Sequence, residues 1–200
     1  MNVVIIKYNA GNIFSVDYAL RRLGVKAEIT GDIEKIQKAD KVIFPGVGEA
    51  ETTMQYLKEH KLDEVIKNLR QPTLGICIGM QLMCQSSEEA ANEKVDCLGI
   101  FDEEVKRFIP NAQINKVPHM GWNTITDLQG PLFKGLPNDP YFYYVHSYYA
   151  TKGADTIATT EYMHPYSAAL HKNNFYAVQF HPEKSGSMGE IILKNFLNLC

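Results

Sequence analysis

Apolar and polar positions follow two different periods along the first half of the chain. Continuous apolar runs at residues 2–8, 41–48 and 73–77 are typical of strands buried on both faces of a parallel sheet. The segments between them repeat apolar residues every three or four positions, which predicts helices. The expected helices are residues 12–24, 32–39, 49–70 and 78–87, with one further short strand at 26–30. Such an alternation predicts a parallel sheet with helices on its faces.

Beyond about residue 95 the pattern changes to shorter β-rich segments. These are residues 103–108, 141–150, 155–162, 166–172 and 175–180, followed by a closing helix at 189–199. We expect this half to be antiparallel or mixed. Because no low-complexity linker, internal repeat or charge run separates the halves, both are expected to share one sheet system. The predicted fold class is α/β, an open mostly parallel sheet flanked by helices with an additional antiparallel or mixed β region, in one domain over residues 1–200.

Composition limits the classes of partner. The 200 residues carry a formal net charge of -3, so nothing points to nucleic acid or an anionic membrane surface. No stretch approaches the ~18 apolar residues of a membrane-spanning helix, and the N-terminal segment is too polar for a signal peptide. Four cysteines without C-x-x-C spacing suggest reduced thiols in a cytoplasmic protein. Metal-binding and cofactor motifs are lacking in the sequence, so we expect neither.

One cysteine lies where a predicted strand meets a predicted helix. In TLGICIGMQL (residues 73–82), Gly75 and Gly79 stand two positions before and after Cys77. A strand-to-helix turn of this G-x-C-x-G type strains the central residue, and larger side chains at the flanking positions would collide. The turn places the thiol at the carboxyl edge of the sheet and at a helix start, which favours the reactive thiolate. A buried structural cysteine is the alternative interpretation.

A cysteine nucleophile needs a base and a group that orients the base. His181 is the candidate base, because it follows the apolar run FYAVQF and precedes Glu183 by two residues. Side chains two residues apart in extended chain leave on the same side, so Glu183 can hold the imidazole in one tautomer. An exposed loop ion pair is the alternative for this H-P-E segment. The other histidines are expected in solvated or packed positions: His60, His119, His146, His164 and His171.

The third chemical requirement is a pair of N–H donors for an oxyanion. The loop FPGVGEA (residues 44–50) follows the third predicted strand, whose carboxyl end should neighbour that of the nucleophile strand. We expect one donor from Val47 in this loop and the other from Ile78, directly after the nucleophile. Since one such donor is worth about 2.7 to 4 kcal/mol in barrier, this loop could control activity. A Pro-Gly turn that starts the next helix is the alternative.

The segments PGVG, GICIGMQ and FHPEKSG, in this order, resemble the motifs of the class I (triad) glutamine amidotransferase family over essentially the whole chain. The resemblance implies that Cys77 attacks the side-chain amide of glutamine, His181 transfers the proton and Glu183 orients the imidazole. Glutamate and ammonia would be the products. The resemblance also implies four substrate-binding positions: Gly48, Gln81, Ser147 and Tyr148.

Three further segments narrow the resemblance. YNAGN (residues 8–12), PHMGWN (residues 118–123) and GMQ after Cys77 are similar to glutaminase subunits of imidazole glycerol phosphate synthases, which act in histidine biosynthesis. This implies a heterodimer with a separate cyclase of the (β/α)8-barrel fold, which receives the ammonia. On the docking face we expect Asn12, Trp122 and Lys184. Core packing of the tryptophan and simple solvation of the other two are the alternatives.

Two other functions are compatible with the same residues. A thiol esterase or peptidase would use a Cys-His-Glu constellation, but it does not account for GMQ together with HSYY. Turnover of glutamine in the presence of a partner distinguishes it. A noncatalytic docking module would be expected to have lost a triad member, whereas all three are present.

Overall fold

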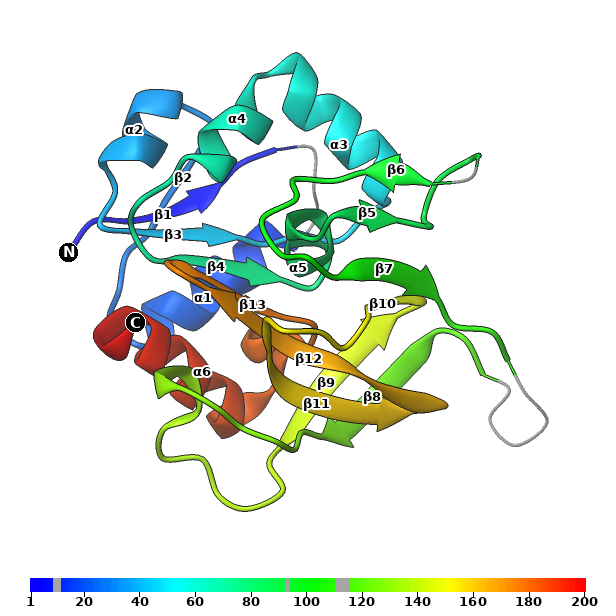
Figure 1. Cartoon of the computed structure of the whole chain (residues 1–200). Helices are drawn as coiled ribbons and strands as arrows, with labels where there is room; N and C mark the ends of the chain where they lie inside the picture. Colours follow the sequence, from blue (N-terminus) through cyan, green and yellow to red (C-terminus); the bar gives the residue numbers. More distant parts are fainter. Residues whose placement is uncertain (9–11, 93, 111–115) are drawn as a thin grey trace.

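The computed structural model describes residues 1–8, 12–92, 94–110 and 116–200. Its centre is a seven-stranded sheet with the strand order β11-β12-β13-β4-β3-β1-β2 (Figure 1). The parallel strands are β1 (Val3–Ile6), β2 (Glu28–Thr30), β3 (Lys41–Phe44), β4 (Thr73–Ile76) and β13 (Phe175–Val178). β11 (Thr156–Tyr162) and β12 (His164–Lys172) add an antiparallel edge. The mostly parallel sheet that the sequence predicts is confirmed.

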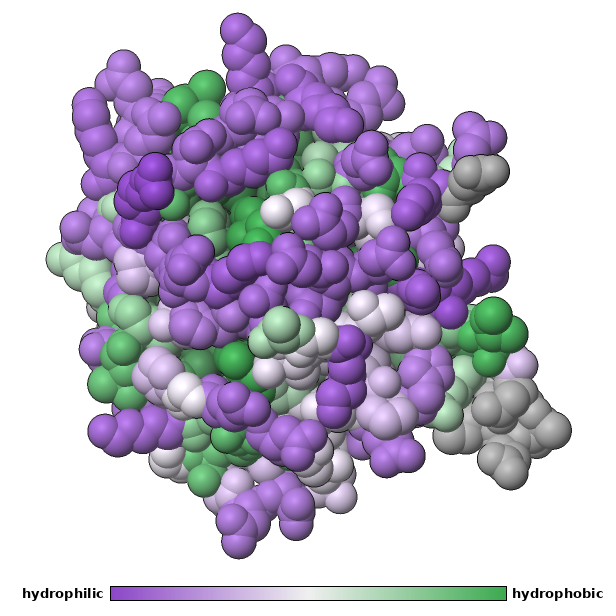
Figure 2. Space-filling view, viewed as in Figure 1, coloured by the Kyte–Doolittle hydropathy of each residue, from purple (hydrophilic) through white to green (hydrophobic). Residues whose placement is uncertain are grey.

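Helices cover both faces of this sheet (Figure 1). One face carries α1 (Ile13–Arg22) and α6 (Gly186–Leu199), and the other carries α2 (Ile33–Lys38), α3 (Ala50–Glu59) and α4 (Leu62–Lys67). Alternate residues of β1 enter the two cores, so Val3 and Val4 belong to different hydrophobic clusters. All four β1 residues are buried, which explains the continuous apolar run. Hydrophilic residues dominate the outer surface of the α2, α3 and α4 layer (Figure 2).

The single long helix expected at residues 49–70 is wrong, because the chain forms α3 and α4 with a break at Lys61. The apolar spacing explains the break. Positions three and four after the buried Leu57 are polar and exposed, and burial resumes only at Leu62. A continuous helix would turn Leu62 away from the core. Lys61, at φ 57°, changes the chain direction and restores the buried face.

Two smaller sheets lie beside the central one. The four-stranded sheet, in the order β10-β7-β5-β6, contains β5 (Ser86–Ser87), β6 (Val95–Asp96), β7 (Glu104–Arg107) and β10 (Tyr148–Ala150). The other pairs β8 (His119–Thr124) with β9 (Tyr141–His146). The expectation of one shared sheet system therefore holds only for β11, β12 and β13 of the C-terminal half.

Two boundaries differ from expectation for the same reason, a change of sheet. The apolar run 141–150 is divided at Ser147, where the chain leaves β9 and enters β10 of the other sheet. The helix expected at 78–87 is α5 (Ile78–Met83), because residues 86–87 pair as β5. Short 3-10 turns at Pro131–Phe133 and Pro182–Lys184 complete the elements. Within the described ranges, no helix is long and apolar enough to cross a membrane.

Three neighbouring parallel strands end at the same edge of the central sheet. β4 lies between β3 and β13, with parallel pairing on both sides. The loop Pro45–Gly48 follows β3, Cys77 follows β4, and Gln179 and His181 follow β13. The expectation that the third strand neighbours the nucleophile strand is confirmed. Carboxyl ends of adjacent parallel strands form the usual ligand-binding edge of open α/β sheets, so the topology gathers three distant segments there.

Candidate active site

Cys77 occupies a strained turn between β4 and α5. Its backbone has φ 54° and ψ -110°, an unfavourable conformation for a residue with a side chain. The turn is tied on both sides, because the Cys77 N–H donates to the Val178 carbonyl at 2.8 Å and the Met80 N–H donates to the Cys77 carbonyl at 3.0 Å. Backbone hydrogen bonds therefore hold the position of the thiol.

The glycines on either side of this turn have the steric role that the sequence suggests. A Cβ on Gly79 would lie 1.9 Å from the backbone oxygen of Phe44 in β3. A Cβ on Gly75 would lie 3.0 Å from the backbone of Gly79. The start of α5 thus packs directly on β3 and β4, which excludes a side chain at Gly79 and leaves only a tight fit for one at Gly75.

His181 and Glu183 form a fully buried pair after β13. His181 Nδ1 lies 2.8 Å from Glu183 Oε1, and both side chains are 0% exposed. The same carboxylate oxygen accepts a hydrogen bond from Asn12 Nδ2 at 2.6 Å. Because a carboxylate only accepts, Nδ1 of the imidazole carries the proton and Nε2 is directed elsewhere. The His181 backbone N–H donates to the Tyr143 carbonyl of β9 at 2.9 Å, which fixes the turn.

The electrostatics of His181 connect it with Cys77. Burial lowers the pKa of the imidazole, but the charge and hydrogen bonding of Cys77 and of Glu183 outweigh it and raise the pKa of His181 to about 10. Among the described residues, no group nevertheless lies in full hydrogen-bond geometry to His181 Nε2. The expected base and the expected nucleophile are therefore close but loosely aligned, as catalytic pairs often are before substrate binds.

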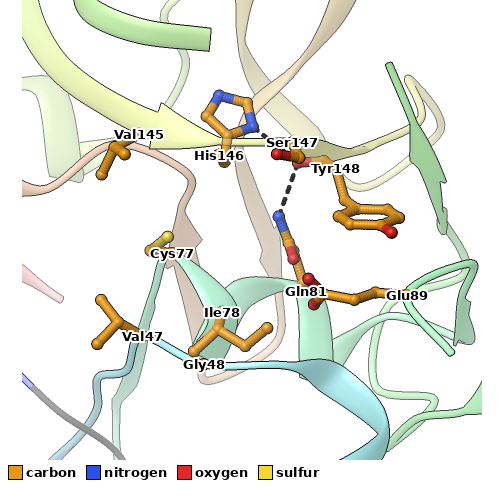
Figure 3. A pocket seen from close by; sticks show the side chains of 10 residues that line it. All are labelled: Val47, Gly48, Cys77, Ile78, Gln81, Glu89, Val145, His146, Ser147 and Tyr148. Atoms are coloured by element: carbon orange, nitrogen blue, oxygen red, sulfur yellow. Dashed lines mark hydrogen bonds between the residues drawn. The ribbon is translucent and has the colours of Figure 1, made fainter. Parts of the chain in front are cut away.

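A cavity of about 90 Å³ opens over Cys77 (Figure 3). It is lined by Val47, Gly48, Cys77, Ile78, Gln81, Glu89, Val145, His146, Ser147 and Tyr148. The structure therefore brings together the expected nucleophile, both expected oxyanion residues and all four expected substrate-binding residues. His181 and Glu183 are buried and are not among the residues that line the cavity.

One side-chain amide and one imidazole converge on the Tyr148 carbonyl beside the cavity (Figure 3). Gln81 Nε2 donates to the Tyr148 carbonyl at 2.8 Å, and His146 Nδ1 donates to the same oxygen at 2.7 Å. Burial lowers the pKa of His146 to about 3, so its imidazole is neutral. The expectation that His146 is a packed histidine agrees with its burial, but this residue also shapes the cavity.

Glu89 is a residue of the cavity that the sequence did not reveal. Burial raises the pKa of its carboxyl to about 7, and a hydrogen bond from the Ala50 N–H at 3.0 Å partly opposes that effect. Glu89 stands in the polar segment SSEEAANE, which has no pattern that separates it from a solvated loop. Only the packing of this segment beside α3 places the carboxylate at the cavity.

The side chains of Tyr8 and Ile78 hold the first residues of the expected oxyanion loop. The Tyr8 hydroxyl donates to the Pro45 carbonyl at 2.6 Å. A Cβ on Gly46 would lie 1.8 Å from that hydroxyl oxygen and 2.5 Å from Ile78 Cγ2, so the peptide passes between these two side chains. Val47 is 37% exposed, and Gly48 has φ 149°, a conformation that favours glycine.

Of the three residues expected on a docking face, Asn12 contacts Glu183, whereas Trp122 and Lys184 both lie against Tyr143. Trp122 is 56% exposed, so it is not a core residue, and its ring contacts Tyr143 edge-on with centroids 6.1 Å apart. Lys184 Nζ lies 5.9 Å from the same tyrosine ring. Asn12 contacts Glu183 instead of being merely solvated. Of the motif YNAGN, residues 9–11 lie outside the described residues.

Comparison with known proteins identifies the family. A family model described as glutamine amidotransferase class-I matches residues 4–199. The chain belongs to the class-I glutamine amidotransferase family. Two solved structures share the fold of this amidotransferase: a putative GMP synthase component from Thermoplasma acidophilum (TM-score 0.76, 21% identity, 100% of this chain and 94% of that chain) and a glutamine amidotransferase (TM-score 0.74, 17% identity, 100% and 98%).

Curated relatives of this amidotransferase share one name, "Imidazole glycerol phosphate synthase subunit HisH". The protein of Bacteroides fragilis is 65% identical over 199 residues and covers 100% of both chains. Those of Pasteurella multocida and Vibrio cholerae are 47% and 46% identical, covering 98% and 99% of this chain and 97% and 98% of their own. Among the described residues of the amidotransferase, no cluster of three or more His, Cys, Asp or Glu side chains is arranged to hold a metal.

Proposed function

We propose that this class-I glutamine amidotransferase is the glutaminase subunit of an imidazole glycerol phosphate synthase. Residues 1–200 act as one glutaminase domain that hydrolyses glutamine in the cytoplasm and delivers ammonia to a separate (β/α)8-barrel cyclase subunit for histidine biosynthesis. The observation that carries the proposal is the strained Cys77 next to the buried His181–Glu183 pair. Full-length similarity to proteins named as that synthase subunit supports the choice of partner.

In the first half-reaction, the Cys77 thiolate attacks the side-chain amide carbon of glutamine. The carbonyl oxygen becomes an oxyanion, which accepts hydrogen bonds from the backbone N–H groups of Val47 and Ile78. His181 gives its Nε2 proton to the departing nitrogen, so ammonia leaves and a thioester remains. Its raised pKa keeps the proton available for this step.

In the second half-reaction, water attacks the thioester carbon. His181, now neutral, takes a proton from the water, and the oxyanion forms again between the same two N–H groups. Collapse breaks the carbon–sulfur bond, releases glutamate and returns the thiolate. Glu183 accepts the Nδ1–H hydrogen bond of His181 throughout, which keeps Nε2 in the reacting tautomer.

The cavity suggests how the amino-acid end of glutamine is held. Glu89 supplies the carboxylate among the residues that line it, and an α-ammonium group is its natural partner. Gly48, Gln81, Ser147 and Tyr148 surround the rest of the ligand, with Ser147 at the point where the chain passes from β9 to β10.

The docking face is proposed at Asn12, Trp122 and Lys184. Tyr143 links the latter two by ring contacts, and Asn12 reaches Glu183, which adjoins Lys184 in sequence. Met120 and Trp122 of β8 are 64% and 56% exposed, an arrangement of large apolar side chains that favours a protein partner. A cyclase bound here would contact residues that touch the triad.

The test is glutamine hydrolysis by Cys77→Ala, measured with and without a candidate cyclase. We expect ammonia release to be lost, because no nucleophile remains, while the variant still binds the cyclase. Cys97→Ala is the matched control, since Cys97 lies outside the cavity. The intact chain alone should show weak turnover.

Unchanged ammonia release by Cys77→Ala would reject the catalytic assignment. Full turnover without any partner would argue against coupling to a cyclase. Hydrolysis of esters or peptides in place of glutamine, with the partner present, would favour the thiol esterase or peptidase alternative.

A further inference from the structure

Gln179 is a buried polar residue without a role in the two half-reactions. It directly follows β13 and is 0% exposed. Its side-chain Nε2 lies 3.7 Å from Cys77 Sγ, and its Oε1 accepts a hydrogen bond from Gln81 Nε2 at 2.9 Å. The amide therefore connects the nucleophile with a residue that lines the cavity.

The orientation of this amide follows from its neighbours. The Tyr148 carbonyl can only accept, and it receives His146 Nδ1–H and Gln81 Nε2–H. This assigns the NH2 group of Gln81 to the side that faces Tyr148, and its second N–H points to Gln179. Gln179 must then present its oxygen to Gln81, which leaves its own NH2 group facing the sulfur.

A donor in this position acts on the charged form of the nucleophile. A hydrogen bond to a thiolate stabilises the thiolate relative to the thiol, and the thiolate is the species that attacks. Burial strengthens the interaction because little water competes for the N–H group. Gln179 and His181 are two residues apart after β13, so a single segment supplies both groups that face Cys77.

We propose that Gln179 is a catalytic residue that donates its side-chain N–H to the Cys77 thiolate, held in the donating orientation by Gln81 and the Tyr148 carbonyl. The inference deepens the proposed function and rests on it, because Gln81 and Tyr148 also line the proposed glutamine site. Binding of the amino-acid end of the substrate and stabilisation of the nucleophile thus share one chain of hydrogen bonds.

The test measures alkylation of Cys77 by iodoacetamide as a function of pH, located by mass spectrometry on the full chain. Gln179→Met keeps the volume but has no donor. We expect the midpoint of its pH–rate profile to move upward by about one unit, with about tenfold slower alkylation below the midpoint. Gln179→Glu should move the midpoint further, because a carboxylate beside the sulfur repels the thiolate.

Gln71→Met is the matched control. Its side-chain Nε2 donates to the backbone carbonyl of Ile36 at 2.8 Å and it lies outside the cavity, so the profile of this variant should equal that of the parent. Gln81→Met should shift the midpoint in the same direction as Gln179→Met, by a smaller amount, because Gln179 loses the group that orients it.

Profiles of Gln179→Met and Gln179→Glu that superimpose on the parent, with unchanged circular dichroism, would overturn the proposal. If Gln179→Met fails to fold, the Gln81→Met profile decides between the two outcomes, because that variant keeps Gln179 and removes only the group that orients it. Iodoacetamide needs no glutamine site, so the result stands even if glutamine is not the substrate. Ammonia release from glutamine, measured separately on the parent, tests that function independently.

Discussion

Two glycine-rich turns meet at the cavity, and they are held in different ways. The elbow at Cys77 is held by backbone: its hydrogen bonds run to Val178 and Met80, and Gly79 packs against the Phe44 carbonyl. The loop Pro45–Gly48 is held by side chains at its two ends. Tyr8 binds the Pro45 carbonyl, and Glu89 binds the N–H of Ala50 just beyond the loop.

The two turns also differ in how deeply their residues are buried. Cys77 and Ile78 are buried, as are Pro45 and Gly46, whereas Val47 and Gly48 are exposed. The core of the fold therefore positions Cys77, the proposed nucleophile. The half of the loop that carries the expected oxyanion donor depends on two side-chain contacts, which makes it the more adjustable of the two parts. Mutations should separate the two turns, since core backbone resists change more than side-chain anchors do.

The largest expected effect comes from adding a methyl group at Gly79 in the elbow, and the same change at Gly48 in the loop serves as the comparison. Gly79→Ala places a Cβ 1.9 Å from the Phe44 oxygen, which cannot move without breaking the pairing of β3 with β4. We expect about 3 kcal/mol lower free energy of unfolding in chemical denaturation, with loss of glutaminase activity. Gly48→Ala is the control: the nearest atom, Thr53 Oγ1, is 3.7 Å from its Cβ, so its cost arises from φ 149° alone and should be about 1 kcal/mol. Equal stability of the two variants would remove the distinction.

A smaller effect should follow from removing the Tyr8 hydrogen bond that holds the start of the loop Pro45–Gly48. Tyr8→Phe deletes the hydrogen bond to Pro45 while the ring stays packed against Phe44, 5.3 Å between centroids. We expect kcat for glutamine to fall about tenfold, less than the hundredfold or more for complete loss of an oxyanion donor. KM and iodoacetamide alkylation of Cys77 should not change. Slower alkylation would mean that Tyr8 supports the elbow as well.

A further effect, which depends on pH, concerns Glu89, the side chain that holds the far end of the loop. The pKa of Glu89 is raised to about 7 in the folded chain, so the folded state keeps a proton that the unfolded state loses from about pH 4.5 upward. This carboxyl therefore lowers stability progressively as pH rises from 4.5 to 7. Glu89→Gln should abolish that slope in denaturation measured across this range.

The same titration should appear in substrate binding. We expect KM for glutamine to rise as pH falls below about 7, because a protonated Glu89 no longer attracts the α-ammonium group. Glu89→Gln should show a KM about tenfold higher at pH 8 and little variation with pH. A KM profile in the variant that still follows the parent's would assign the titration to another group.

Several residues show which features of the fold and of the site could be predicted from the sequence alone. The turn at Cys77 and the pairing of His181 with Glu183 were predictable, because both depend on neighbours within a few positions. The break at Lys61 is readable in principle from the spacing of Leu57 and Leu62, although the run as a whole predicts one helix. Tyr8, Glu89 and Gln179 were not predictable as parts of the site, since their partners are 37, 39 and 102 residues away.

Local patterns in the sequence thus determined the types of the main elements, the strained cysteine turn and the family motifs, because periodicity, glycine sterics and short spacings act between near neighbours. Tertiary structure alone decided that β4 lies between β3 and β13, that the chain changes sheets at Ser147, and that the Gln179 amide faces the sulfur. The physical reason is that strand order and the orientation of buried amides depend on partners brought together only when the whole sheet packs. A buried donor or acceptor must then be satisfied by whichever group lies beside it.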